Sequence, residues 1–134
     1  MKTIPAVGKY MTTTPRLLGP ADTLSTAHEL MKSLGIRHLP VCEGDRVLGV
    51  LSDGDLLRAE SLRDADPTRI KATDVMTPNP YTVSPQAPLD EVVKEMAAKK
   101  LGSAVIVDND KVVGVFTATD ALTAFAELLH TRLS

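Results

Sequence analysis

The chain has 134 residues, of which 43% are hydrophobic and 24% are charged, and its formal net charge is -2. This composition is typical of a soluble globular protein, because no run of apolar residues approaches the ~20 that a membrane-spanning helix needs. Aromatic residues make up only 3% of the chain and no basic stripe is visible, so we expect neither a nucleic acid nor a membrane as a partner.

The N-terminus and the cysteine count both favour a cytoplasmic protein. The first seven residues are interrupted by Pro5 and are too few to form the apolar core of a secretory signal. Cys42 is the only cysteine, so the chain cannot form an internal disulfide. A reducing compartment is therefore the expected location.

A repeat divides the sequence into two halves. Residues 49–55 read Gly-Val-Leu-Ser-Asp-Gly-Asp, and residues 114–120, which follow at an offset of 65, read Gly-Val-Phe-Thr-Ala-Thr-Asp. Units of this size are marginal alone, and repeated units usually bury their apolar faces against each other. We predict two packed units over residues 7–62 and 72–133, joined by a polar, proline-containing linker at 63–71.

Each unit is predicted to open with a short helical turn and a strand. The pair Met11-Thr12 in the first unit matches Met76-Thr77 in the second, and a proline follows each pair. The residue before a proline avoids helical backbone, so the turn should end there. The strands are then predicted at residues 16–18 and 81–83.

A long amphipathic helix follows in each unit. Asp22 or Thr23 can cap the first helix, which should close at Gly35, and Pro88 suits the first turn of the second, which should end before Gly102. Apolar residues recur at helical spacing in both helices and predict the buried faces. They are Leu24, Ala27, Met31 and Leu34 in the first, and Leu89, Val92, Val93 and Met96 in the second.

Two β-hairpins come next, over residues 38–51 and 103–116. Their turns are predicted at 43–45 and 108–110, where Gly, Asn and Asp interrupt the apolar runs. The strands carry nearly unbroken Val, Ile and Leu and not an alternation of apolar and polar residues. This pattern predicts that both faces of each sheet are covered.

The last helix of each unit starts at the repeated motif, from Asp55 to about Leu62 and from Asp120 to about Leu133. Each unit therefore reads β-α-β-β-α, a mixed α/β (α+β) fold whose first strand lies parallel to the hairpin through a right-handed crossover. One face of the final helix carries an apolar stripe, which predicts a homodimer because such faces rarely stay exposed. The stripe consists of Leu122, Phe125, Ala126, Leu129 and Leu133.

The closing motif has the chemistry of a nucleotide site. A strand that ends in Ser52 or Thr117 at a helix N-terminus offers a hydroxyl and free N–H groups to a phosphate oxygen. Three residues later, Asp55 or Asp120 can accept hydrogen bonds from the two hydroxyls of a ribose. The alternative is that these residues only cap helices, a role worth about 1 kcal/mol each.

Two copies of β-α-β-β-α, each opening with a Met-Thr turn and closing with Gly-Val-x-Ser/Thr-x-x-Asp, resemble a tandem pair of cystathionine β-synthase (CBS) domains. The resemblance covers residues 7–125 and implies two units related by a pseudo-twofold axis, with ligands in the clefts between them. The implied regulatory ligands are AMP, ATP, NAD or S-adenosylmethionine, and no cofactor is required. The implied contacts are Thr117 and Asp120 in one half, Ser52 and Asp55 in the other, and Leu18, His38, Val83 and Ser103 against the base.

The charges near the motif depart from the family pattern. Many members carry a basic residue next to the closing Asp, where this chain has Gly54 and Thr119. Asp53 adds a negative charge that would oppose a phosphate. We therefore expect the site of Thr117 to bind better than that of Ser52, and a monophosphate to bind better than a triphosphate. The cations that could offset Asp53 are Arg37, Arg16 and Lys111.

Two functions are weighed. In the first, the chain senses an AMP-like adenosine nucleotide and signals through its dimer or an unknown effector protein. In the second, it is a ligand-free dimerisation module. An enzyme is disfavoured, because no base, nucleophile and orienting group converge in the motifs. His38 and Cys42 lie four residues apart on one strand, about 13 Å at ~3.3 Å per residue, which is beyond hydrogen-bond reach. No metal is expected, since the Asp-rich turns lack the spacing of a calcium loop.

Overall fold

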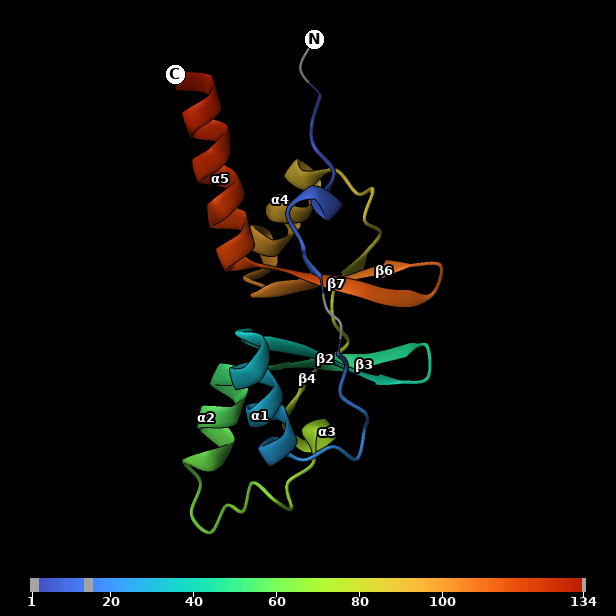
Figure 1. Cartoon of the computed structure of the whole chain (residues 1–134), viewed down its shortest axis with the longest axis vertical. Coiled ribbons are helices and arrows are strands. Elements are labelled where there is room, and N and C mark those ends of the chain that lie inside the picture. The colour runs from blue at the N-terminus through green and yellow to red at the C-terminus, as the bar shows by residue number, and fades with distance from the viewer. Residues whose placement is uncertain (1–2, 14–15, 134) are drawn as a thin grey trace. The chain divides into compact units, whose positions relative to one another are not determined.

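The computed structural model describes residues 3–13 and 16–133, with Leu133 described by its backbone only (Figure 1). Thr14 and Pro15, at the end of the first predicted opening turn, lie outside the described residues. The chain divides into two compact units, Thr14–Pro80 and Met1–Thr13 together with Tyr81–Ser134. We call them the Ser52 unit and the Thr117 unit, after the hydroxyl residue of the closing motif in each.

The Ser52 unit packs its helices on a small antiparallel sheet. Its strands lie in the order β2-β3-β4, and before them Leu18 makes a single parallel bridge to Val41. In Figure 1, α1 and α2 cover the same face of the β2–β3 hairpin. The elements are α1 (Leu24–Leu34), β2 (His38–Glu43), β3 (Arg46–Ser52), α2 (Asp53–Glu60), α3 (Ala72–Val75) and β4 (Thr77–Pro78).

The Thr117 unit has a four-stranded sheet in the order β1-β7-β6-β5, in which β5 is parallel to β6. Both α4 and α5 lie on one face of its β6–β7 hairpin (Figure 1). The elements are η1 (Val7–Lys9), β1 (Thr12–Thr13), β5 (Thr82–Val83), α4 (Leu89–Lys99), β6 (Ser103–Asp108), β7 (Lys111–Thr117) and α5 (Ala118–Leu133). None of the helices in the described ranges is long and apolar enough to cross a membrane.

The predicted β-α-β-β-α order is confirmed, but the first strand predicted at 16–18 is reduced to the single bridge of Leu18, and the helix ends shift slightly. Thr23 is the N-cap of α1, where its Oγ1 accepts a hydrogen bond from the Thr26 N–H at 3.4 Å. Gly35 ends this helix in the left-handed conformation, with φ of 66°. The equivalent conformation after α4 is adopted by Lys100, with φ of 56°, two residues before the expected Gly102. The final helices start at residues 53 and 118, because Ser52 and Thr117 precede them as caps.

The opening segment of each sequence repeat packs in the unit of the other repeat. Strand β1 pairs with β7, and β4 pairs with β3. Each compact unit therefore contains the opening segment of one sequence repeat and the remainder of the other repeat. The repeat in the sequence does not reveal this exchange. The two opening segments are equivalent in sequence, and so are the strands β3 and β7, so either segment could be expected to pair with either strand.

Two glycines make room for the exchanged segments. A Cβ atom built on Gly49 would lie 2.5 Å from the carbonyl oxygen of Thr77, and one on Gly114 would lie 2.7 Å from that of Thr12. Both distances are far below van der Waals contact. The glycine that begins each closing motif is therefore required by the backbone that packs against it.

Each unit has its own hydrophobic core, formed by helix residues against the hairpin. Consecutive residues of β2, Leu39, Pro40 and Val41, are all buried, which agrees with the prediction that both sheet faces are covered. The Ser52 unit buries Leu18, Leu24, Ala27, Met31, Leu39, Val41, Leu51, Leu56, Ala59 and Ala72. The Thr117 unit buries Val7, Leu89, Val92, Met96, Ala104, Ile106, Phe116 and Ala124.

We predict that Gly49→Ala and Gly114→Ala each lower the free energy of unfolding by about 1–3 kcal/mol, the usual cost of overpacking. The added methyl group must displace the backbone of Thr77 or Thr12. Chemical denaturation of the purified variants measures the loss. Gly19→Ala is the matched control, because its Cβ would meet only the Asp22 Oδ2 atom at 3.6 Å. Equal stability of all three variants would contradict the packing described here.

Candidate functional site

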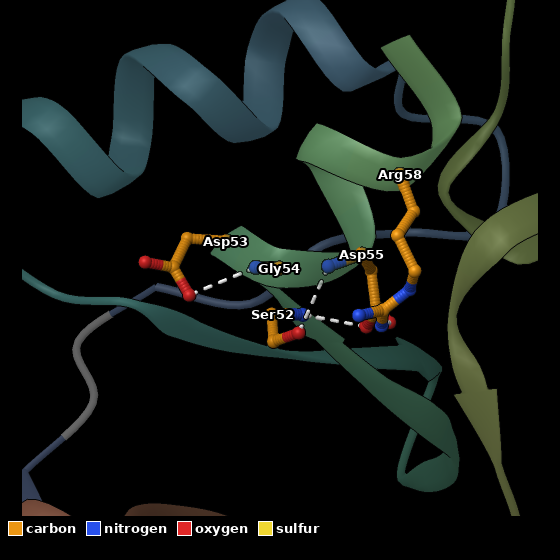
Figure 2. A network of polar contacts seen from close by, with 5 residues as sticks. All are labelled: Ser52, Asp53, Gly54, Asp55 and Arg58. Atoms are coloured by element: carbon orange, nitrogen blue, oxygen red, sulfur yellow. Dashed lines mark hydrogen bonds and ion pairs between the residues drawn. The ribbon is translucent and has the colours of Figure 1, made fainter. Parts of the chain in front are cut away.

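The closing motif of each unit forms a capping box at the start of a helix. In the Ser52 unit, the Asp55 N–H donates to Ser52 Oγ at 3.1 Å, and the Ser52 N–H donates to Asp55 Oδ2 at 2.9 Å (Figure 2). In the Thr117 unit, the Asp120 N–H donates to Thr117 Oγ1 at 3.3 Å, and the Thr117 N–H donates to Asp120 Oδ2 at 2.9 Å. The four predicted motif residues therefore meet in two matching pairs, and the capping role weighed from sequence is present in both.

The two carboxylates differ in their third partner. Asp55 Oδ1 lies 2.5 Å from Arg58 Nη2, in an ion pair along one turn of α2. Asp120 Oδ1 instead accepts a hydrogen bond from Thr12 Oγ1 at 3.0 Å. Asp55 is 8% exposed and is the one buried charged residue in the described part of the chain. A buried carboxylate needs such partners, because removing it from water without them is costly.

Strand pairing places two further predicted residues beside the motifs. His38 on β2 lies opposite Ser52 on β3, and Ser103 on β6 lies opposite Thr117 on β7. Both His38 and Ser103 are half-buried. Each unit therefore brings a hydroxyl, a carboxylate and a side chain of the neighbouring strand to the same end of its hairpin.

Arg37 lies at the motif as well, but its guanidinium faces Asp53. Its Nε atom is 3.9 Å from Asp53 Oδ2, and its carbonyl oxygen accepts the Asp53 N–H at 2.9 Å. Figure 2 shows the Asp53 side chain pointing away from Asp55 and Arg58, with Oδ1 accepting the Gly54 N–H at 2.9 Å. Because Asp53 points away from Asp55 and has a cation within 3.9 Å, its charge no longer gives a reason to expect the Ser52 site to be the weaker one.

Leu18 and Val83 do not lie opposite the motif residues as His38 and Ser103 do. Leu18 is 1% exposed and its side chain belongs to the core of the Ser52 unit. Its N–H donates to the Pro40 carbonyl at 2.9 Å. Val83 is half-buried on β5 opposite Ile106, three residues along β6 from Ser103, and packs against the core of the Thr117 unit. Leu18 is therefore a core residue, and Val83 packs on the edge of a core.

Two residues at the site were missed from the sequence. Arg58 follows Asp55 by three residues on α2, a spacing at which helical side chains are neighbours, so the spacing alone could have indicated it. Thr12 reaches Asp120 only because β1 pairs with β7. That contact follows from the exchange of the opening segments and has no signal in the local sequence.

Cys42 lies away from this chemistry. It is 7% exposed and lies at the turn end of β2, where its partner across the hairpin is Val47 on β3. Burial raises the pKa of its thiol, so the reactive thiolate is disfavoured. Within residues 3–13 and 16–132, no three His, Cys, Asp or Glu side chains gather closely enough to hold a metal ion.

Comparison with known proteins identifies the motif-bearing units. A family model described as CBS domain matches residues 7–62 and 72–127. The solved structure of a Vibrio cholerae protein assigned to acetoin utilization (AcuB) is 32% identical, with a TM-score of 0.80 over 97% of this chain and 96% of that one. The structure of CBSX2 in complex with AMP is 26% identical, with a TM-score of 0.77 over 92% of this chain and 97% of that one.

Curated relatives include longer proteins. The inosine-5'-monophosphate dehydrogenase of Korarchaeum cryptofilum is 31% identical over 104 residues, which make up 77% of this chain and 21% of the dehydrogenase. Among the first curated relatives that the chain matches, it spans from 21% to 68% of their length. The similarity to the dehydrogenase is therefore confined to a fifth of that protein.

Proposed function

The chain belongs to the CBS domain family, and from this premise we propose that it is a regulatory module that binds an adenosine nucleotide at its two closing motifs. The observation that carries the proposal is the matching pair of hydroxyl and carboxylate at a helix start in each unit. The similar protein CBSX2, solved with AMP, supports an AMP-like ligand. A role in regulation is proposed in preference to catalysis.

The carboxylates of the capping boxes keep acceptor positions for a ligand. An ionised carboxylate has about four lone-pair positions. Asp55 accepts the Ser52 N–H and Arg58, and Asp120 accepts the Thr117 N–H and the Thr12 hydroxyl. Hydroxyls of a ribose can therefore bind Asp55 or Asp120 without opening the box, while the Ser52 or Thr117 hydroxyl and the helix N-terminus face a phosphate. The boxes fix these groups before binding, which lowers the cost of ordering the site.

The proposed signal leaves through the helices that begin at the motifs. A ligand at the start of α2 or α5 changes the electrostatic environment of that helix end. A chain that contacts those helices can then be bound more or less tightly with the ligand than without it. The partner is proposed to be a second copy of this chain or an effector protein.

We expect AMP to stabilise the chain, by about 2.7 kcal/mol for each occupied site at 100 times its dissociation constant. A thermal-shift titration measures this effect. Asp55→Asn and Asp120→Asn should each reduce the shift, because an amide keeps a capping oxygen but loses the charge that strengthens hydrogen bonds to ribose.

The matched control for these variants is Asp66→Asn. Asp66 also accepts a backbone N–H, from Thr68 at 3.0 Å, but lies outside the motifs. Its variant should keep the full shift with AMP. A wild type that shows no shift with any adenosine nucleotide would leave the ligand-free dimerisation module as the function.

The exposed face of α5 supports a homodimer. Leu122 is 69% exposed, Phe125 is 61% exposed and Leu129 is 43% exposed. Beside Phe125 lies an apolar cavity of about 190 Å³. Apolar faces of this kind on a folded chain usually mark a contact with another chain. The cavity is lined by Ile4, Pro5, Leu89, Asp90, Val93, Ala121, Ala124, Phe125 and Leu128.

We expect Leu122→Asp and Phe125→Asp to produce monomers, because each would place a charge in an apolar contact between two copies. Light scattering should give twice the chain mass of 14.3 kDa for the wild type and the single mass for the variants. His130→Asp, on the polar face of α5, is the control and should stay dimeric. If the wild-type protein had the mass of one chain at micromolar concentration, the proposed dimer would be refuted.

A further inference from the structure

We infer that Arg58 makes the Ser52 site selective for adenosine ligands that carry an anionic phosphate, whereas the Thr117 site lacks this selectivity. The inference rests on the proposed function and deepens it, because it assigns a different ligand charge to each site. The sequence alone instead favours the Thr117 site for phosphate ligands, because Asp53 adds a negative charge beside Ser52.

The guanidinium of Arg58 lies directly on the closing motif of the Ser52 unit. Its Nη2 atom contacts Asp55 Oδ1 at 2.5 Å, and its Nη1 atom is 3.4 Å from the Cβ position of Gly54. The same Cβ position is 3.7 Å from Ser52 Oγ. A cation therefore lies on the carboxylate at the helix start that the proposed function assigns to phosphate, as Figure 2 shows.

The side chain of Arg58 is also free to change partners. It is 74% exposed, while the Asp55 carboxylate that it contacts is 8% exposed. A planar guanidinium presents five N–H donors, so it can bind a phosphate oxygen while it keeps or releases Asp55. Arg37 pairs with a different carboxylate, since its Nε atom lies 3.9 Å from Asp53 Oδ2. Figure 2 shows the Asp53 side chain pointing away from Asp55 and Arg58.

The equivalent position of the Thr117 unit is Thr123, 65 residues later. Its hydroxyl donates to the Thr119 carbonyl oxygen along α5 at 3.1 Å. Residues 117–123 contain no cation, and the second oxygen of Asp120 is held by the neutral Thr12 hydroxyl. The same two capping hydrogen bonds form in both motifs, so the cation is the difference that the inference rests on.

This difference has opposite consequences for charged and neutral ligands. At the Ser52 site, a neutral nucleoside must compete with Arg58 for Asp55 and gives the guanidinium no other anion. A nucleotide offers a phosphate that Arg58 can bind in exchange. At the Thr117 site, neither ligand has to displace a cation. The preference for AMP over adenosine should therefore be larger at the Ser52 site.

The test is an NMR titration of the ¹⁵N-labelled full chain with AMP and, separately, with adenosine. The backbone amide of Gly54 reports on the Ser52 site and that of Thr119 on the Thr117 site, so each site is read without a second mutation. The variant is Arg58→Ala. Arg69→Ala is the matched control, because Arg69 is 87% exposed and forms the same i,i+3 ion pair, with Asp66 at 3.6 Å.

We expect Arg58→Ala to weaken AMP binding at the Gly54 amide by about tenfold, the effect of losing one hydrogen bond to a charged group. The affinity for adenosine measured at the Gly54 amide should be unchanged or higher. The affinities for both ligands measured at the Thr119 amide should not change. Arg69→Ala should behave as the wild type.

Three results would overturn the inference: an equal preference for AMP at both amides of the wild type, no effect of Arg58→Ala, or an equal loss of AMP and adenosine binding. The last result would mean that Arg58 only positions Asp55. If neither amide moved with either ligand in the wild type, the proposed function itself would fail, which is a distinct outcome.

Discussion

The capping box at each strand-to-helix junction is the interaction on which the rest of the site depends. It joins the last residue of β3 or β7 to the third residue of the helix that follows, through one hydroxyl and one carboxylate. The same two groups that satisfy the helix start are the groups proposed to hold a nucleotide. Stability and ligand binding are therefore coupled in the same few atoms, and a variant of either Asp must be read against both roles.

The two junctions have the same capping hydrogen bonds and different surroundings. Gly49 and Gly114 let the exchanged opening segments lie against the strands that lead into the motifs. In the Thr117 unit this contact brings Thr12 to Asp120, while in the Ser52 unit the carboxylate is paired with Arg58 on its own helix. Duplication thus preserves the capping geometry, and single side chains around it set the charge of each site.

Much of this arrangement could be predicted from the sequence, because local patterns determine it. The offset between the motifs, the capping residues and the hydrophobic spacing of the helices located the elements and the pairing of Ser52 with Asp55. Contacts between distant segments could not be predicted, as with Thr12 and Asp120. The orientation of Asp53 was also hidden, since a residue at the start of a helix can face either side. Leu18 shows the same limit, because strand position did not reveal that its side chain is buried.

A crystal structure of the chain grown with AMP is the most direct test of the account. It should show the ribose hydroxyls within about 3 Å of the carboxylate oxygens of Asp55 or Asp120, the normal hydrogen-bond distance, with both capping boxes intact. The account would be contradicted by crystals in which AMP is absent from both motifs, or is bound elsewhere, while these two carboxylates keep only the partners described above.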